Sequence, residues 1–208
     1  MKHFFLIRHG QIEECYRALF YGQMDVPLSV EGQKKSEELV GQLVSLSIKG
    51  IFSSPLKRAL YPAKLLAERK GLTLEVREEL KEIDYGEWTG KPRESIHKEA
   101  LFWERFIDDT LAPPKGESIR ALRDRARMFW LHILGLKEEG LYIVFTHGGF
   151  IRAFLCEILN LKSSLFYAFE SYHLKGPLIT FFQDGQFVIR GFNFEAQTLK
   201  LLLETSYW

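Results

Sequence analysis

Residues 141–149 read Leu-Tyr-Ile-Val-Phe-Thr-His-Gly-Gly, and this stretch decides the class of fold. Residues 141–146 are apolar almost throughout, which predicts a strand that is covered on both faces. The strand ends at His147, and the residues after it predict a helix that runs through Leu159. A buried strand that leads directly into a helix is typical of a parallel sheet in an α/β protein.

A matching strand is predicted near the N-terminus, where residues 3–7 are apolar and stop at Arg8-His9-Gly10. Residues 50–52 and 72–77 predict two short strands, and residues 177–191 predict a hairpin around Asp184-Gly185. Together these patterns predict an α/β fold, a three-layer sandwich with a mostly parallel central sheet and helices on both faces.

Helices are expected where a capping residue precedes apolar residues at helical spacing. They cover residues 29–46 after the cap Ser29, residues 54–70 from Ser54-Pro55 up to Gly71, and residues 118–136 after the cap Ser118. Pro62 lies inside the second of these helices, where a kink is expected. Residues 92–111 are rich in charged and aromatic side chains, so we expect one domain over residues 1–208 with a helical excursion at about 90–115.

Composition excludes several classes of protein. The 208 residues carry a formal net charge of +1, which argues against a nucleic-acid binder with a broad basic face. No apolar run approaches the roughly 18 residues that a membrane helix needs, and the N-terminal apolar stretch is too short for a signal peptide. Two cysteines, Cys15 and Cys156, form no disulfide framework, so we expect a cytoplasmic protein with reduced thiols.

The first candidate site lies at the ends of the two best-defined strands, because each strand is followed by a histidine and a glycine. His9 and His147 would meet at one edge of a parallel sheet, where α/β proteins bind their ligands. Residues 53–58 follow another strand and bring Arg58 to the same edge. One such histidine is as readily a satisfied core residue, but two at matching strand ends favour a shared site.

The residue types at this edge suit a phosphate group. Guanidinium groups such as those of Arg8 and Arg58 bind phosphoryl oxygens in a bidentate manner, and a desolvated imidazole can attack phosphorus. A metal site is the competing interpretation of a histidine pair. Two arginines would repel a divalent cation, and no cluster of carboxylates supplies ligands, so we expect an anion site without a metal.

The motifs resemble those of the histidine phosphatase superfamily, the phosphoglycerate mutase-like group. The matching stretches are residues 6–10 (LIRHG), 21–29 (YGQMDVPLS), 53–59 (SSPLKRA), 80–88 (LKEIDYGEW), 116–118 (GES) and 146–149 (THGG). They occur in the expected order between residues 6 and 152. In pattern the chain is most similar to α-ribazole phosphatases and metal-independent phosphoserine phosphatases.

The resemblance implies a role for each site residue, and no cofactor. His9 would be the nucleophile, with its ring held by a hydrogen bond from one nitrogen to a backbone carbonyl. The catalytic residue His147 would clamp the phosphate together with Arg8 and Arg58, and the backbone of Gly148 would also bind it. Glu82 matches the proton donor to the leaving oxygen and would later act as base toward water. Its alternative interpretation is a surface carboxylate.

Three positions depart from the family pattern. Cys15 stands where an asparagine commonly touches the phosphate, and a thiol is a weaker donor. We expect a buried, inert thiol there, with an oxidisable thiol near arginines as the alternative. Gln11 replaces a frequent glutamate, and Pro62 replaces a non-proline residue and is expected to tilt the turn that carries Arg58.

The resemblance leaves three functions open. We expect a phosphatase for a small phosphomonoester, because the segment from Glu82 to His147 is shorter than in typical mutases. The alternatives are a cofactor-dependent phosphoglycerate mutase and a non-catalytic regulatory subunit that keeps the phosphate pocket. Candidates for the substrate side are Gln11, Cys15, Tyr85 and Arg152. Aromatic residues gather near the C-terminus, among them Phe192, Phe194, Tyr207 and Trp208. We expect most of them in the core and some to cover the face of a homodimer or the mouth of the pocket.

Overall fold

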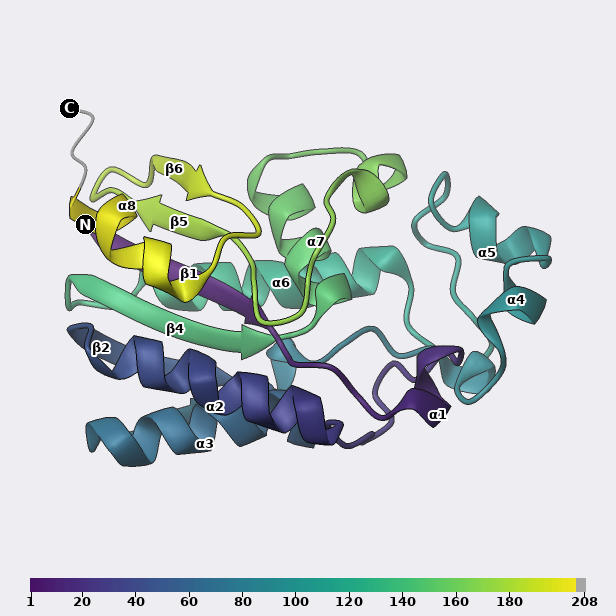
Figure 1. Ribbon diagram of the computed structural model, residues 1–208. Coiled ribbons are helices and arrows are strands. Elements are labelled where there is room, and N and C mark those ends of the chain that lie inside the picture. The colour runs from purple at the N-terminus through teal and green to yellow at the C-terminus, as the bar shows by residue number, and fades with distance from the viewer. Residues whose placement is uncertain (205–208) are drawn as a thin grey trace.

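The computed structural model describes residues 1–204, and a six-stranded sheet lies at its centre (Figure 1). The strands are β1 (Lys2–Arg8), β2 (Ile48–Ser53), β3 (Leu74–Val76), β4 (Gly140–Thr146), β5 (Leu178–Phe181) and β6 (Phe187–Gly191). Their order is β3-β2-β4-β1-β5-β6, with β1 to β4 parallel and β5 and β6 antiparallel. The mostly parallel sheet and the C-terminal hairpin expected from the sequence are confirmed.

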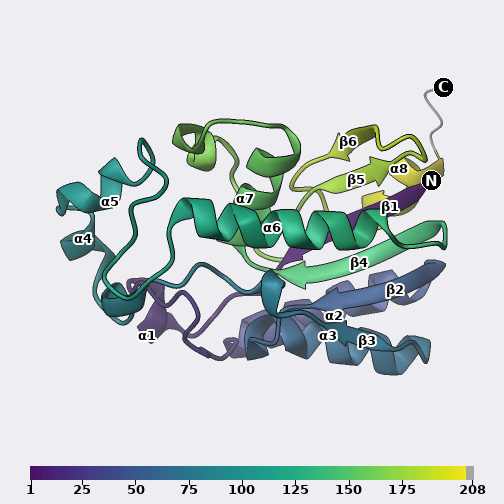
Figure 2. The ribbon, with the colours of Figure 1, turned by 180° about the vertical axis from the view of Figure 1, so that it is seen from behind.

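Helices cover both faces of the sheet, which gives three layers. One face is covered by α2 (Val30–Val44), α3 (Lys57–Lys70) and α8 (Leu199–Glu204), and the other by α6 (Ile119–Leu134) and α7 (Gly148–Ile158), which Figure 2 shows from behind. Strand β1 supplies both cores, because successive side chains of a strand point to opposite faces. Phe5 and Ile7 pack toward α2 and α3, while Phe4 and Leu6 pack toward α6 and α7.

The predicted caps at Ser29 and Ser118 are confirmed. Each hydroxyl accepts a hydrogen bond from a backbone N–H three residues on, at 3.0 Å. The predicted start of α3 at Ser54-Pro55 is wrong, since the helix begins at Lys57. The N–H of Ser54 still donates to Phe145 O in the neighbouring strand, and this bond delays the helix. The helix then runs through Pro62 to Gly71, as predicted.

The helical excursion lies beyond one end of the sheet, as Figure 1 shows for α4 and α5. It consists of α4 (Arg93–Ile96) and α5 (Ala100–Glu104), and a short helix that the sequence did not predict, α1 (Glu14–Arg17), lies nearby. Single 3-10 turns complete the fold: η1 (Glu78–Leu80), η2 (Gly86–Trp88), η3 (Ser163–Ala168) and η4 (Ala196–Thr198). Among residues 1–204, no helix is long and apolar enough to cross a membrane.

The C-terminal aromatic residues within the described part of the chain mostly contribute to packing. Phe194 stacks on Phe5 with ring centroids 5.0 Å apart, and Phe192 contacts Phe169 at 5.9 Å. Tyr207 and Trp208 lie outside the described residues.

Candidate active site

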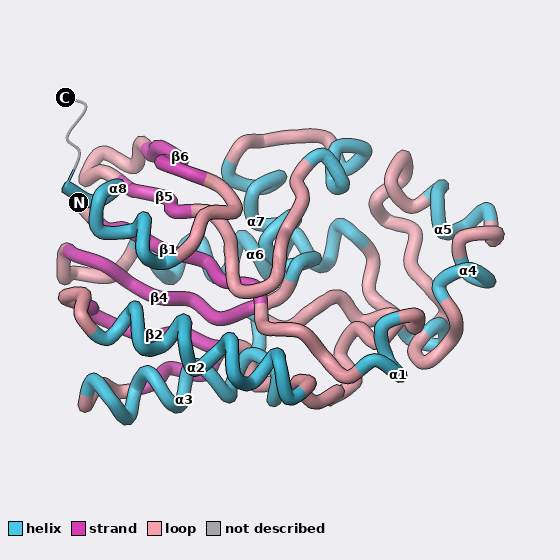
Figure 3. Tube along the Cα trace, in the orientation of Figure 1, coloured by secondary structure: helices cyan, strands magenta, loops and turns pink. Residues whose placement is uncertain are grey.

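His9 and His147 stand side by side at the carboxyl ends of β1 and β4. The two strands are parallel, with Arg8 opposite Thr146, and His9 N–H donates to Thr146 O at 3.0 Å. The two imidazole centroids are 5.2 Å apart. Loops and short helices surround this end of the sheet (Figure 3), so side chains from distant parts of the chain reach it.

The ring of His9 is buried and fixed in one tautomer. Its Nδ1 lies 2.7 Å from Gly10 O, and because a carbonyl only accepts, Nδ1 must carry the proton. Nε2 therefore keeps a free lone pair. Burial lowers the pKa of His9 well below its usual value, and the charges of Arg58 and, to a smaller extent, Arg8 lower it further. His9 is thus a neutral imidazole with one nucleophilic nitrogen.

Two backbone oxygens bind the terminal nitrogens of Arg58, whereas its Nε has no partner within the described residues. Its two terminal nitrogens donate to Met24 O at 2.8 Å and to Gly22 O at 2.6 Å. Its Nε is buried and has no hydrogen-bond partner within residues 1–204. The guanidinium also lies 5.1 Å from the ring centroid of Tyr21. These contacts fix a fully buried cation at the start of α3.

Arg8 and His147 have the same arrangement of one anchored and one unpartnered nitrogen. Arg8 Nη1 donates to Ser171 O at 2.6 Å, while its Nε is buried without a partner. His147 Nε2 lies 2.8 Å from the Ser54 hydroxyl, and its Nδ1 is likewise unpartnered within the described residues. Burial, followed by the charge of Arg58, lowers the pKa of His147 well below its usual value. Buried donors without partners are rare, and several together indicate a ligand with several acceptor oxygens.

Glu82 reaches the site from the loop after η1. Its carboxylate accepts N–H groups from Ile83 at 2.9 Å and from Gly149, in the first turn of α7, at 3.1 Å. A Cβ at residue 149 would overlap Glu82 Oε1, so only glycine allows this approach. The backbone oxygen of Glu82 accepts from Gln23 Nε2 at 3.0 Å and from Arg125 Nη2 at 3.3 Å. The carboxyl group is therefore held at the N-terminus of α7.

A cavity of about 170 Å³ opens beside these groups. It is lined by Arg8, Tyr21, Gly22, Glu82, Tyr85, Arg93, Gly148, Gly149, Arg152, Phe166 and Tyr167. Four side chains named from the sequence therefore meet at one cavity, together with the backbone of Gly148. His9, Arg58 and His147 are buried and are not among the residues that line it. Within residues 1–204, no group of three His, Cys, Asp or Glu side chains could hold a metal ion.

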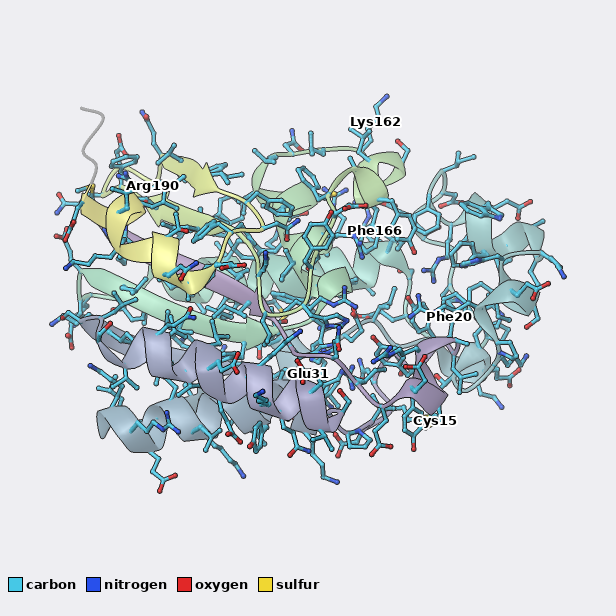
Figure 4. All side chains as sticks on the ribbon, viewed as in Figure 1. Cys15, Phe20, Glu31, Lys162, Phe166 and Arg190 are labelled. Atoms are coloured by element: carbon cyan, nitrogen blue, oxygen red, sulfur yellow. The ribbon has the colours of Figure 1, made fainter. Side chains whose placement is uncertain are left out.

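Two of the substrate-side candidates are not brought to this cavity. Gln11 lines a separate cavity between α2 and the segment around Lys175. Cys15 is exposed on α1, at the rim of the molecule in Figure 4, so the expectation of a buried thiol is wrong. No residue of α1 is buried, because this short helix lies on the surface and turns Cys15 outward.

Sequence reasoning missed His173, which packs against His9. Its ring centroid is 5.4 Å from that of His9, and its Nδ1 donates to His9 O at 2.9 Å. Burial, helped by the charge of Arg8, lowers the pKa of His173 to about 4. Sequence reasoning also missed Ser54 as the partner of His147, although its position directly after β2 was a usable signal.

An α/β sheet that presents two neutral histidines and two arginines at its carboxyl edge defines a class of site built for a tetrahedral oxyanion. The model of the histidine phosphatase superfamily (branch 1) matches residues 4–195, so the chain belongs to this superfamily. The resemblance seen in the sequence motifs is thereby confirmed.

Relatives within the family carry two kinds of name. The chain is 29% identical to "Phosphoserine phosphatase 1" of Hydrogenobacter thermophilus over 170 residues, which are 79% of each protein. It is 27% identical to "Probable phosphoglycerate mutase GpmB" of Salmonella choleraesuis over 162 residues, 76% of this chain and 75% of that one. Among solved structures, a mycobacterial glucosyl-3-phosphoglycerate phosphatase with inorganic phosphate is 25% identical, with a TM-score of 0.80 over 95% of this chain and 99% of that one.

Proposed function

We propose that the protein is a metal-independent phosphatase that hydrolyses a small phosphomonoester through a phosphohistidine at His9. The observation that carries this proposal is the neutral ring of His9, with its free Nε2 beside the unpartnered nitrogens of Arg8, Arg58 and His147. A nucleophile among fixed positive donors is what phosphoryl transfer requires. The two guanidinium groups already supply the positive charge that a metal ion would otherwise provide.

In the first step, His9 Nε2 attacks phosphorus and the ester P–O bond breaks. The leaving oxygen takes a proton from the carboxyl group of Glu82, so the alcohol departs neutral. Arg8, Arg58 and His147 donate to the phosphoryl oxygens, where negative charge is spread in the transition state. Both oxygens of Glu82 accept backbone N–H groups, which fixes the carboxyl group without consuming its second lone pairs.

In the second step, water attacks the phosphohistidine. Glu82, now ionised, takes one proton from that water, and the P–N bond breaks to return neutral His9 and inorganic phosphate. Because Gly10 O still holds Nδ1–H, the same nitrogen is regenerated for the next turnover. The cycle ends with the protonation states with which it began.

The names of relatives support a phosphatase and also keep a mutase as second candidate, since one relative is named a probable phosphoglycerate mutase. A mutase must shield its phosphohistidine from water. The short segment between Glu82 and His147 and the small size of α4 and α5 offer little cover, which favours hydrolysis.

The test is a panel of phosphomonoesters assayed for phosphate release with excess EDTA. We expect release by the wild type that survives EDTA and is lost in His9→Ala but not in the control His132→Ala. His132 lies on α6, and its ring contacts Glu75 of β3. Dependence on added metal, or activity that survives in His9→Ala, would contradict the proposal. Interconversion of phosphoglycerates faster than phosphate release would identify a mutase, and phosphate binding without turnover a regulatory subunit.

We further propose that the protein works in the cytoplasm, which its two unbridged cysteines, Cys15 and Cys156, support. Cell fractionation tests the location. The homodimer remains a prediction of the sequence, and sedimentation velocity decides it.

A further inference from the structure

The three arginines that line the cavity have no acidic partner within the described residues, whereas six arginines elsewhere in the chain do. Arg17, Arg77, Arg120, Arg123, Arg125 and Arg127 each pair with a carboxylate. Among residues 1–204, no carboxylate oxygen lies within 4.0 Å of the guanidinium of Arg8, Arg93 or Arg152. Glu82 is the one acidic side chain among the cavity's described lining residues. The cavity therefore carries an excess of fixed positive charge.

The phosphoryl group accounts for only part of this charge. In the proposed mechanism, Arg8 and Arg58 balance a phosphate dianion. Arg93 and Arg152 remain, and each lines the cavity with terminal nitrogens that make no hydrogen bond within the described residues. Placing like charges together costs free energy unless an anion lies among them.

Arg152 is the better placed of the two. It lies on α7, where its Nε donates to Phe169 O at 2.8 Å and its guanidinium stacks on Tyr167 with 5.2 Å to the ring centroid. The position of a Cβ on Gly148 would be 3.5 Å from Arg152 Nη1 and also 3.5 Å from Arg8 Nε. Arg152 therefore brings a second guanidinium to the rim of the phosphate site.

Arg93 enters the cavity from α4, and its orientation is also fixed. Its Nε donates to Leu19 O at 3.1 Å, and its guanidinium lies 5.6 Å and 5.7 Å from the ring centroids of Phe20 and Tyr21. An arginine that is stacked and bonded through Nε loses less entropy when its terminal nitrogens bind an anion.

A third cation lies behind the cavity wall. Arg105 is fully buried, and its Nε and Nη1 have no hydrogen-bond partner within residues 1–204. Its guanidinium is 5.5 Å from the ring centroid of Tyr85, which lines the cavity, and three further rings surround it, those of Trp88, Phe102 and Phe106. Aromatic faces stabilise the cation without neutralising it, so its field reaches the cavity through a medium of low dielectric constant.

Resting on the proposed phosphatase function, we propose that the alcohol part of the ester carries a second anionic group, a carboxylate or another phosphate, and that Arg152 and Arg93 bind this group. The cavity of about 170 Å³ is smaller than the roughly 300–1,000 Å³ of sites for drug-sized ligands. The second anion is therefore only a few bonds from the ester oxygen. The substrate class is a short phosphorylated acid or bisphosphate.

The test compares esters of the same three-carbon length that differ in charge. 3-Phosphoglycerate and glycerol 3-phosphate differ by a carboxylate in place of a hydroxymethyl group, and 1,3-propanediol bisphosphate offers a second phosphate instead. We expect kcat/KM to be about ten- to hundredfold higher for at least one of the two esters with a second anionic group than for glycerol 3-phosphate, the range expected for hydrogen bonds to charged groups. Whichever is preferred identifies the second anion.

The variant Arg152→Gln should remove most of this preference through KM, because the second anion loses its partner, and kcat/KM should fall less for glycerol 3-phosphate than for the preferred ester. Arg93→Gln should act in the same direction. The control Arg127→Gln, which loses an exposed ion pair to Glu157, should keep the preference. Equal hydrolysis of all three esters by the wild type, or an equal loss for all three in Arg152→Gln, contradicts this inference and leaves the phosphatase standing. Hydrolysis of other phosphomonoesters but of none of these three contradicts this inference, and hydrolysis of no ester in the whole panel contradicts the proposed function itself.

Discussion

The side-chain hydroxyl of Ser54 contacts both the imidazole of His147 and the backbone just before α3. Its hydroxyl oxygen accepts the N–H of Leu56 at 3.3 Å and lies 2.8 Å from His147 Nε2. A hydroxyl can donate and accept at the same time, and we expect it to donate to Nε2 here, because neutral His147 then carries its proton on Nδ1, which is buried and has no partner within the described residues. In the proposed mechanism, this Nδ1–H donates to a phosphoryl oxygen.

Replacing Ser54 by alanine should therefore let neutral His147 adopt either tautomer, with the proton on Nδ1 or on Nε2. We expect Ser54→Ala to lower kcat/KM about tenfold, comparable to the loss of an orienting partner of a metal-bound histidine, and to change its pH profile. The matched control is Ser53→Ala, which also loses a buried hydroxyl but one that bonds Ser54 O and does not touch His147. Equal effects of the two substitutions would show that Ser54 acts only on stability.

The proposed role of Glu82 as general acid predicts that its replacement affects esters with poor leaving groups most, because only these need a proton from the enzyme. Glu82→Gln keeps an oxygen to accept from Gly149 N but cannot donate a carboxylic proton. For an alkyl phosphate, kcat should fall about 10²–10⁴-fold, while for p-nitrophenyl phosphate, whose phenolate leaves without a proton, the burst of product should be nearly unchanged. A burst rate that falls as much for the aryl ester would remove Glu82 from the role of acid.

At the scale of single residues, the sequence predicts those site residues that follow strand ends. His9, His147 and Arg58 come together because parallel strands end at one edge of the sheet. His173 enters from the loop before β5, and no pattern around it predicts that contact. The error over Cys15 has a similar cause, since spacing from His9 does not reveal that the chain turns outward at α1.

At the scale of elements, α6 braces the loop that carries Glu82. Arg125 on α6 donates to Glu79 O at 2.5 Å and to Lys81 O at 3.0 Å, and it forms an ion pair with Glu117. Hydrogen bonds from a mostly buried guanidinium to backbone oxygens hold the loop near α7.

Arg125→Met should loosen this loop and leave the phosphate cradle in place. We expect the free energy of unfolding, measured with urea, to fall by about 1.5–3 kcal/mol, the range for hydrogen bonds to charged groups. Turnover of alkyl phosphates should fall more than the aryl ester burst, as for Glu82. The control Arg120→Met, on the same helix with an exposed ion pair to Asp109, should change neither rate. Equal losses on both esters would mean that Arg125 supports the whole site.

Local sequence signals locate most of the helices and strands, but not every boundary. Apolar runs and the caps Ser29 and Ser118 locate the strands and long helices within a few residues, since burial on both faces and capping are local signals. The start of α3 is missed because a bond from Ser54 N to Phe145 O belongs to the neighbouring strand. The helix α1 has four residues and no buried side chain, so it leaves no periodic pattern.

For the whole molecule, buried neutral histidines predict a dependence of stability on pH. Burial lowers the pKa of His3 and of His173 to about 4 and places those of His9 and His147 well below their usual value. The unfolded chain binds these protons near pH 6.5 and the folded chain only at lower pH. The contribution of these histidines to the free energy of unfolding is therefore fully present above about pH 6.5 and is lost as the pH falls toward 4.

Urea unfolding at pH 7, 6 and 5 measures this loss. Each such histidine contributes a slope of at most about 1.4 kcal/mol per pH unit. The variant His173→Asn should show a shallower slope, since one buried imidazole is gone. A free energy of unfolding that is constant or rises from pH 7 to 5 would contradict the burial of neutral rings.

The formal charge of +1 conceals an uneven distribution over the molecule. Surface arginines such as Arg120 and Arg127 are paired with carboxylates, whereas those of the cavity are not. A nearly neutral protein thus concentrates positive charge at one edge of its sheet, which suits a small anionic ester.

Trapping the phosphoenzyme tests whether His9 carries the phosphoryl group during turnover. The wild type is mixed with a ³²P-labelled substrate, quenched in alkali during the first turnover and digested. We predict label on the peptide that contains His9, stable in base and lost in acid as expected for a phosphoimidazole, and none in His9→Ala. Full-rate phosphate release with no label on His9, or label on another residue, would contradict the account.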